Sequence, residues 1–152
     1  MTDFGTQMIT WMKDLFPLCR SLTGDGVDNT LNYLEKKATI DFKIVKFKTG
    51  QKVFDWTIPK VWNIKDGYIE TLKGEKIINF KNNNLHVLGY STSINKIVSK
   101  EELLKHTHTQ PNQPKWIPYV TSYYKKNWGF CISENFKKNI KNKRYKVHIN
   151  ST

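Results

Sequence analysis

The spacing of the apolar residues changes once along this chain, and that change limits the possible folds more than any other feature. Near the start, the apolar residues recur as they do on one face of a helix: Phe4, Met8, Trp11, Met12 and Leu15. Asp3 is in the position of an N-cap for this helix, and Pro17 ends it. After a glycine-containing turn at 23–26, the same spacing predicts a second helix from Val27 to about Ala38.

From residue 40 the period becomes that of a β-strand, in which alternate residues are apolar. Ile40, Phe42 and Ile44 predict a first strand, which ends at Thr49 and Gly50. Further strands are predicted at 52–58, 67–72, 76–80 and 85–90, forming an antiparallel lobe with short turns. Two helices followed by such a lobe indicate the α+β class.

The remaining elements are shorter. Ser99 and Glu102 have the spacing of a capping box, which predicts a short helix as far as Lys105. A proline-containing loop follows, and alternating apolar residues at 145–149 then predict a final strand. This strand is either an outer strand closed by earlier segments or part of a domain that continues past Thr152. In the second case we expect an exposed sheet edge that promotes self-association.

The formal charge of +12 suggests a nucleic-acid binder, but the identity of the cations weakens this interpretation. The chain has 23 Lys and two Arg, Arg20 and Arg144, whereas bidentate recognition of phosphate or guanine relies on Arg. The sequence therefore predicts weak, non-specific retention of nucleic acid and no specific binding. The basic run at 137–144 is interpreted as a solvated surface.

Targeting features and cysteine usage favour a cytoplasmic protein. No apolar run is long enough to span a membrane, and the N-terminus lacks the pattern of a signal peptide. Cys19 and Cys131 are far apart in apolar surroundings, so we expect buried, reduced thiols.

His106 and His108 are the residues that most resemble metal ligands, because alternating residues of an extended segment point to one side. A zinc site needs a third ligand, and no motif in the chain supplies one. Two other interpretations stay open: the imidazoles hydrogen-bond the proline-containing loop, or they reach a pocket that is completed elsewhere. No serine or cysteine lies in a nucleophile motif either, so the chain is predicted to contain no catalytic residue and no metal ligand of its own.

Aromatic residues gather between residues 116 and 130, interleaved with lysines. They are Trp116, Tyr119, Tyr123, Tyr124, Trp128 and Phe130. Such a group could belong to the core, line a ligand pocket or form a stacking surface for single-stranded nucleic acid. Together with the two histidines, Tyr123, Tyr124 and Trp128 are the candidates for a substrate pocket.

Four segments of the chain resemble one known family. They are LFPLCRSLTGDG at 15–26; VFDWTIP at 53–59 with WNI at 62–64; NLHV at 84–87 with YS at 90–91; and HTHTQP at 106–111 with IPY at 117–119, TSYY at 121–124 and WGFC at 128–131. The chain is similar to aminopeptidase-like proteins of the zinc-exopeptidase fold that are associated with polysaccharide biosynthesis. In that family a small β domain of unknown function is inserted near the front of the peptidase domain.

The resemblance implies a division into three parts. Residues 1–50 would begin the aminopeptidase-like domain, residues 51–105 would form the inserted β domain, and residues 106–152 would return to an incomplete α/β sheet of the peptidase. The family's metal-binding motifs lie beyond the matched region. Zinc is therefore expected for a full-length member and not for this chain.

Two functions are consistent with these observations. In the first, the chain is the N-terminal fragment of a zinc-dependent aminopeptidase-like hydrolase and is inactive alone. Its partner would be the missing C-terminal peptidase portion or another copy of itself. In the second, it is a stand-alone β-rich module that binds a protein or a sugar-related ligand.

Overall fold

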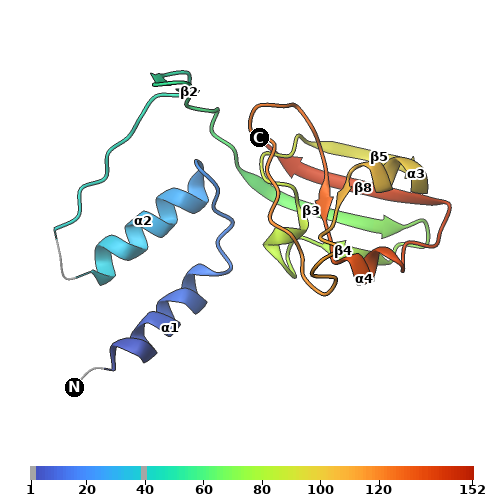
Figure 1. Ribbon diagram of the computed structural model, residues 1–152, viewed down its shortest axis with the longest axis horizontal. Coiled ribbons are helices and arrows are strands. Elements are labelled where there is room, and N and C mark those ends of the chain that lie inside the picture. Colours follow the sequence, from blue (N-terminus) through green and yellow to red (C-terminus); the bar gives the residue numbers. More distant parts are fainter. Residues whose placement is uncertain (1–2, 39–40) are drawn as a thin grey trace. The chain divides into compact units, whose positions relative to one another are not determined.

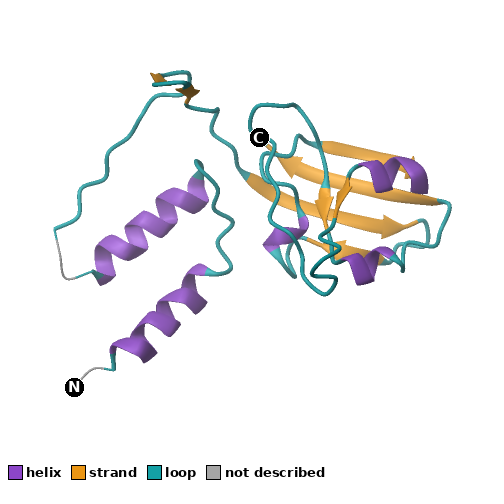
Figure 2. Ribbon diagram, in the orientation of Figure 1, coloured by secondary structure: helices purple, strands orange, loops and turns teal. Residues whose placement is uncertain are grey.

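The computed structural model describes residues 3–38 and 41–152. The chain divides into two compact units, residues 1–63 and residues 64–152, which we call the N-terminal unit and the sheet unit. Figure 1 shows the order of the elements and Figure 2 their type. Helices and antiparallel sheets occur together, so the predicted α+β class is confirmed.

Both predicted helices are present in the N-terminal unit. α1 (Phe4–Leu15) begins after Asp3, whose carboxylate accepts a hydrogen bond from the backbone N–H of Gly5 at 3.0 Å. α2 (Asp25–Lys37) begins two residues earlier than predicted. Its N-terminus is capped from a distance, because the side-chain amide oxygen of Asn63 accepts a hydrogen bond from the backbone N–H of Asp25 at 2.8 Å.

The apolar face of α1 is open, and that of α2 is only partly covered. Neither α1 nor α2 contains a buried residue. In α1, Phe4, Met8 and Met12 expose 75%, 61% and 65% of their surface. Because soluble helices normally bury such a stripe, α1 presents an apolar surface that the described residues of this unit leave uncovered.

The predicted first strand is wrong over the part of it that the structure describes. Residues 41–48 form neither helix nor strand, and Ile40 lies outside the described residues. A strand needs a neighbour for its backbone N–H and C=O groups, and residues 41–48 pair with no described strand. Val45 and Phe47 are consequently 60% and 62% exposed.

The predicted strand at 52–58 is a tight hairpin. β1 (Lys52–Val53) pairs antiparallel with β2 (Trp56–Thr57). Phe54 lies in the turn with a φ of 55° and is 99% exposed. The apolar residues at 53, 54 and 56 therefore lie in and beside a turn, and none of the three is buried.

Four strands of the sheet unit form one antiparallel sheet in the order β4-β3-β8-β5 (Figure 1). Their bounds are β3 (Ile64–Thr71), β4 (Lys76–Asn79), β5 (Ile94–Ser99) and β8 (Arg144–Ser151). The predicted strands at 67–72 and 76–80 are confirmed, as is the hairpin between them. Its turn places Gly74 at a φ of 89°, a conformation that glycine adopts without strain.

The final predicted strand is also confirmed, but its predicted edge position is wrong. β8 lies inside the sheet, where it pairs with β3 on one side and β5 on the other. Tyr145, Val147 and Ile149 point into the core and are almost fully buried. Since β8 has no free edge, self-association through this strand is not expected. The exposed face of α1 is the better candidate for it.

The predicted strand at 85–90 is wrong. This segment contains the short 3₁₀ helix η1 (Asn84–His86), which starts where the Asn83 side chain accepts a hydrogen bond from the backbone N–H of Leu85. Val87 then forms an isolated bridge with Phe130. The strand that does complete the sheet, β5, was not predicted.

Short helices complete the core of the sheet unit. α3 (Lys100–Lys105) has the predicted bounds, and Ser99 caps it by accepting from the Glu102 backbone N–H at 3.2 Å. Leu103 of α3 packs in the core, as does Ile140 after α4 (Glu134–Lys137). The resemblance implied a domain boundary between residues 105 and 106, and this position lies inside the sheet unit. One of the two inner strands, β8, comes from the expected return segment 106–152.

Among the described residues, no helix combines the length and apolar character that crossing a membrane requires.

Candidate functional site

A short parallel ladder holds the segment that contains the candidate residues. β6 (Thr107–His108) pairs with β7 (Phe130–Cys131) in parallel. The backbone N–H of Phe130 donates to the His106 carbonyl at 2.9 Å, and that of Ile132 donates to the His108 carbonyl at 3.1 Å. Because Phe130, Cys131 and Ile132 are completely buried, the two histidines are attached to a rigid part of the core.

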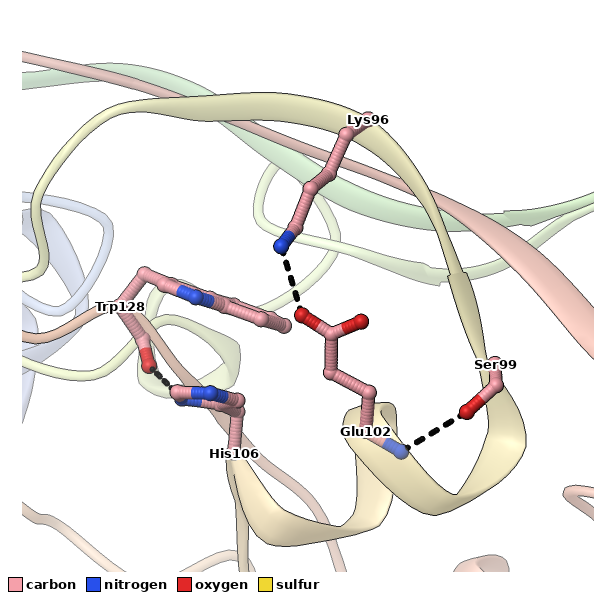
Figure 3. Close-up of polar contacts among 5 residues, drawn as sticks. All are labelled: Lys96, Ser99, Glu102, His106 and Trp128. Atoms are coloured by element: carbon pink, nitrogen blue, oxygen red, sulfur yellow. Dashed lines mark hydrogen bonds and ion pairs between the residues drawn. The ribbon is translucent and has the colours of Figure 1, made fainter.

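His106 and Trp128 form a stacked pair (Figure 3). Their ring centroids are 3.9 Å apart with an interplanar angle of 18°. Nδ1 of His106 also lies 2.9 Å from the carbonyl oxygen of Trp128. A carbonyl only accepts hydrogen bonds, so Nδ1 carries the proton and donates it. Two of the predicted site residues, His106 and Trp128, are therefore in contact, and the imidazole holds the loop that contains Trp128.

The same tryptophan is covered by an ion pair. Nζ of Lys96 lies 5.8 Å from the centroid of the Trp128 ring and 2.6 Å from a carboxylate oxygen of Glu102 (Figure 3). The Glu102 backbone N–H is bound by Ser99, so this carboxylate is held in place from the start of α3. Trp128 is half-buried and lies between a cation and an imidazole.

His86 is a third histidine of this region, and the sequence analysis did not select it. Its Nδ1 lies 2.9 Å from the carbonyl oxygen of Cys131. Burial lowers the pKa of His86, and the hydrogen bond to Cys131 opposes this shift. His86 and Cys131 are distant in the sequence, so no local pattern could have indicated their contact.

His108 differs from His86 and His106 in its ring hydrogen bonding. Its Nε2 is buried and has no hydrogen-bond partner among the described residues. Burial lowers the pKa of His108, and the neighbouring His106 lowers it further. Gly129 is required at this point, because a Cβ there would lie 2.9 Å from the His106 carbonyl oxygen and 3.4 Å from Nε2 of His108. The neutral imidazole of His108 is therefore packed tightly against the main chain.

Tyr123 and Tyr124 belong to a separate group. Tyr123 lies edge-to-face with buried Tyr90 at 5.3 Å and with Tyr124 at 5.4 Å. The loop that carries them is tied to Gly89, whose N–H donates to Val120 and whose carbonyl accepts from Ser122. Tyr123 is 36% exposed and Tyr124 is 59% exposed. Tyr123 therefore joins Tyr90 and Tyr124 in one aromatic group.

The available donors do not fit a zinc ion. Within the described residues, no three His, Cys, Asp or Glu side chains are placed to hold a metal. His86 and His106 direct Nδ1 at backbone carbonyls. Burial raises the pKa of the Cys131 thiol to about 11, which keeps it protonated, although a thiolate is the form that binds metals and attacks substrates.

Comparison with known proteins supplies the context for this site. Residues 61–152 match DUF2172, a domain of unknown function. A Clostridium acetobutylicum protein named "Putative polysaccharide biosynthesis protein with aminopeptidase-like domain" is 45% identical over 151 residues, which are 99% of this chain and 34% of that protein.

A solved structure agrees with this similarity. The 2.37 Å crystal structure of a "putative peptidase" from Clostridium acetobutylicum matches with a TM-score of 0.91 and 45% sequence identity. The match covers 99% of this chain and 35% of that one. The chain therefore spans about a third of the length of each of these relatives.

Proposed function

Because the chain belongs to the DUF2172 family and resembles aminopeptidase-like relatives along almost its full length, we propose that it is the N-terminal portion of a zinc-dependent, cytoplasmic aminopeptidase-like hydrolase that is not catalytic alone. One observation carries this proposal: the similarity covers 99% of this chain but only 34% of the relative. The catalytic residues and the zinc ligands would then lie in the other two thirds.

The surface of the N-terminal unit supports a partner of this kind. α1 and α2 bury no residue, and residues 41–48 belong to no helix or strand and carry exposed Val45 and Phe47. An open apolar helix face and an unpaired segment fit a neighbouring domain that offers an apolar surface and a sheet edge. The proposed partner is the C-terminal peptidase portion.

The candidate residues would have two different roles in the complete protein. His106 and Trp128 fix the loop, because each is occupied by stacking and hydrogen bonding. His108, Tyr123 and Tyr124 would supply the pocket wall, since they combine a rigid backbone with an unused imidazole nitrogen or exposed phenol rings. In an aminopeptidase, zinc activates water and polarises the scissile carbonyl. This chain would bind and orient the substrate.

A chimera tests the proposal directly. The matching 151 residues of the Clostridium acetobutylicum relative would be replaced by this chain, which leaves the remaining two thirds of the relative intact. We expect zinc-dependent hydrolysis of at least one substrate in a panel of aminoacyl p-nitroanilides. The isolated chain should be inactive. An intact, zinc-loaded relative without activity on any peptide substrate would count against the hydrolase proposal.

Substitutions in the chimera separate the pocket wall from the scaffold. Tyr123→Ala and His108→Ala should raise KM or lower kcat while zinc content stays unchanged and the chimera remains folded at the assay temperature. Lys126→Gln is the matched control, because Lys126 is exposed on the same loop. If both wall variants behave like this control, the pocket roles are wrong, although the fragment proposal stands. If the chimera folds but gains no activity, a stand-alone binding module becomes the better interpretation.

A further inference from the structure

We propose that the sheet unit has a binding site for a small phosphorylated molecule, located in a hollow between the β3–β4 turn and the start of β8. The hollow has a volume of about 440 Å³. It is lined by residues of the turn and of the segment that enters β8, namely Thr71, Leu72, Lys73, Glu75, Asn142, Lys143 and Arg144. This site is distinct from the proposed substrate pocket, because none of His108, Tyr123 and Tyr124 lines the hollow.

The charge of the hollow favours an anion. Lys73, Lys143 and Arg144 contribute three cations, and Glu75 is the single acid among the lining residues. Within the described part of the chain, none of the three cations forms an ion pair. Lys146 on the same strand behaves differently, since its Nζ lies 3.8 Å from a carboxylate oxygen of Glu70. Three cations that line one hollow and form no ion pair among the described residues leave their charge available to a ligand.

Arg144 gives the hollow its preference for phosphate. A guanidinium presents a planar pair of N–H donors that matches two oxygens of a phosphate, whereas an ammonium acts as a point charge. The other arginine of the chain, Arg20, donates to the Leu15 carbonyl at 2.6 Å. The basic run at 137–144, interpreted from the sequence as a solvated surface, thus ends at a concave site.

Backbone hydrogen bonds fix both walls of the hollow. The N–H of Thr71 donates to the Glu75 carbonyl at 2.8 Å, and the N–H of Gly74 donates to the Thr71 carbonyl at 3.0 Å. On the other wall, the Lys143 carbonyl accepts from the backbone N–H of Lys100 at 2.9 Å. Only the side chains must be ordered when a ligand binds, which lowers the entropic cost of binding.

The lining also indicates the size of the ligand. A volume of about 440 Å³ is within the usual range for small-molecule sites and leaves space beside a phosphate group. Leu72, 59% exposed, offers an apolar contact to the attached organic group. No aromatic ring lines the hollow, so the base stacking on which single-stranded nucleic acids depend is lacking. A single phosphorylated small molecule fits these features better than a nucleic acid.

Calorimetric titration of the full 152-residue chain tests the site with four probes: glucose 1-phosphate, inorganic phosphate, glucose and a single-stranded DNA octamer. We expect saturable binding of glucose 1-phosphate and none of glucose. If inorganic phosphate binds equally well, the phosphate group alone is the ligand. Tighter binding of glucose 1-phosphate would show that the organic group contributes. Either result supports the site.

Charge-matched variants decide whether binding occurs in this hollow. Arg144→Gln and Lys73→Gln should each weaken glucose 1-phosphate binding about tenfold, and Arg144→Lys should restore only part of the loss. Lys126→Gln removes the same charge outside the hollow and should change nothing. Circular dichroism and the melting temperature establish that each variant is folded. Absence of saturable binding, or an equal loss in Lys126→Gln, overturns the proposal. DNA binding that is tighter and is lost in the same variants would replace it with a nucleic-acid site.

Discussion

The imidazole of His106 lies parallel to the indole of Trp128 at 3.9 Å, while its Nδ1 donates a hydrogen bond to the carbonyl of the same residue. One side chain therefore satisfies a backbone acceptor and covers an aromatic face. Lys96 lies over the same indole and is itself held by Glu102. This cluster joins β5 and α3 to the loop that leads into β7.

Removal of this imidazole should destabilise the sheet unit without changing its fold. We expect His106→Ala to lower the free energy of unfolding by about 1–2 kcal/mol, because both the stacking and the hydrogen bond are lost. His106→Asn keeps a donor near the Nδ1 position and should recover part of the loss. Urea titration followed by tryptophan fluorescence measures both values. A loss below about 0.3 kcal/mol for His106→Ala would show that the pair contributes nothing.

Gly129 should not tolerate a side chain. In Gly129→Ala the new Cβ would lie 2.9 Å from the His106 carbonyl oxygen and 3.2 Å from Cδ2 of Leu88, so the backbone must shift. We expect a loss of about 1–3 kcal/mol in urea unfolding. Gly74→Ala is a useful comparison, because its Cβ meets no neighbour and the cost arises from the positive φ alone. Gly129→Ala should be the more damaging of the two variants.

The sheet unit should lose stability in mild acid through His86 and His108. Their folded-state pKa values lie below the ordinary value of 6.5, mainly because of burial. The unfolded chain therefore binds protons first as the pH falls through 6.5, and stability that is complete above this pH decreases below it. The double variant His86→Asn, His108→Asn should show a flatter dependence of stability on pH as the pH falls below 6.5. Equal slopes for the two proteins would contradict this prediction.

The two thiols should differ in reactivity. Cys131 is completely buried, and burial raises its pKa to about 11. Cys19 is only partly buried, and burial raises its pKa as well. At pH 8, iodoacetamide should modify Cys19 of the folded chain well before Cys131. Peptide mass spectrometry over time measures both rates, and unfolding in urea should remove most of the difference.

The open face of α1 should be dispensable for the fold of the sheet unit. We expect Met8→Ser with Met12→Ser to change the urea unfolding of residues 64–152 by less than about 0.5 kcal/mol, because neither side chain is buried. The same pair should reduce self-association in analytical ultracentrifugation. Ile149→Ala is the contrasting core variant and should cost about 2–5 kcal/mol. An unchanged sedimentation profile would mean that this face is not the associating surface.

Local patterns predicted the elements whose cause is local. The helical spacing and Asp3 identified α1, the Ser99–Glu102 pair identified α3, and the alternation at 145–149 identified β8. The helix caps act within a few residues, and the alternation that identified β8 can be read within one segment, although the pairing of β8 cannot. The predicted strand at 85–90 was wrong because the Asn83 side chain favours a 3₁₀ turn over an extended conformation.

Pairing between distant segments could not be predicted in this way. The internal position of β8 depends on β3 and β5, which come much earlier in the chain. The candidate site shows the same limit. His106 and Trp128 were predicted as pocket residues, a role that stays a prediction. Their mutual stacking and the hydrogen bond of His86 depend on how the core folds, and no local pattern indicates them. The pocket roles of His108, Tyr123 and Tyr124 remain predictions that the chimera must test.

The internal position of β8 has a consequence for synthesis on the ribosome. Tyr68 of β3 pairs with His148, and Asn95 of β5 pairs with the same residue. Until His148 leaves the exit tunnel, β3 and β5 have no strand between them and their inner edges stay open. The sheet therefore cannot close before β8 has been synthesised, so the unpaired edges of β3 and β5 should be open to aggregation and to chaperone binding until then.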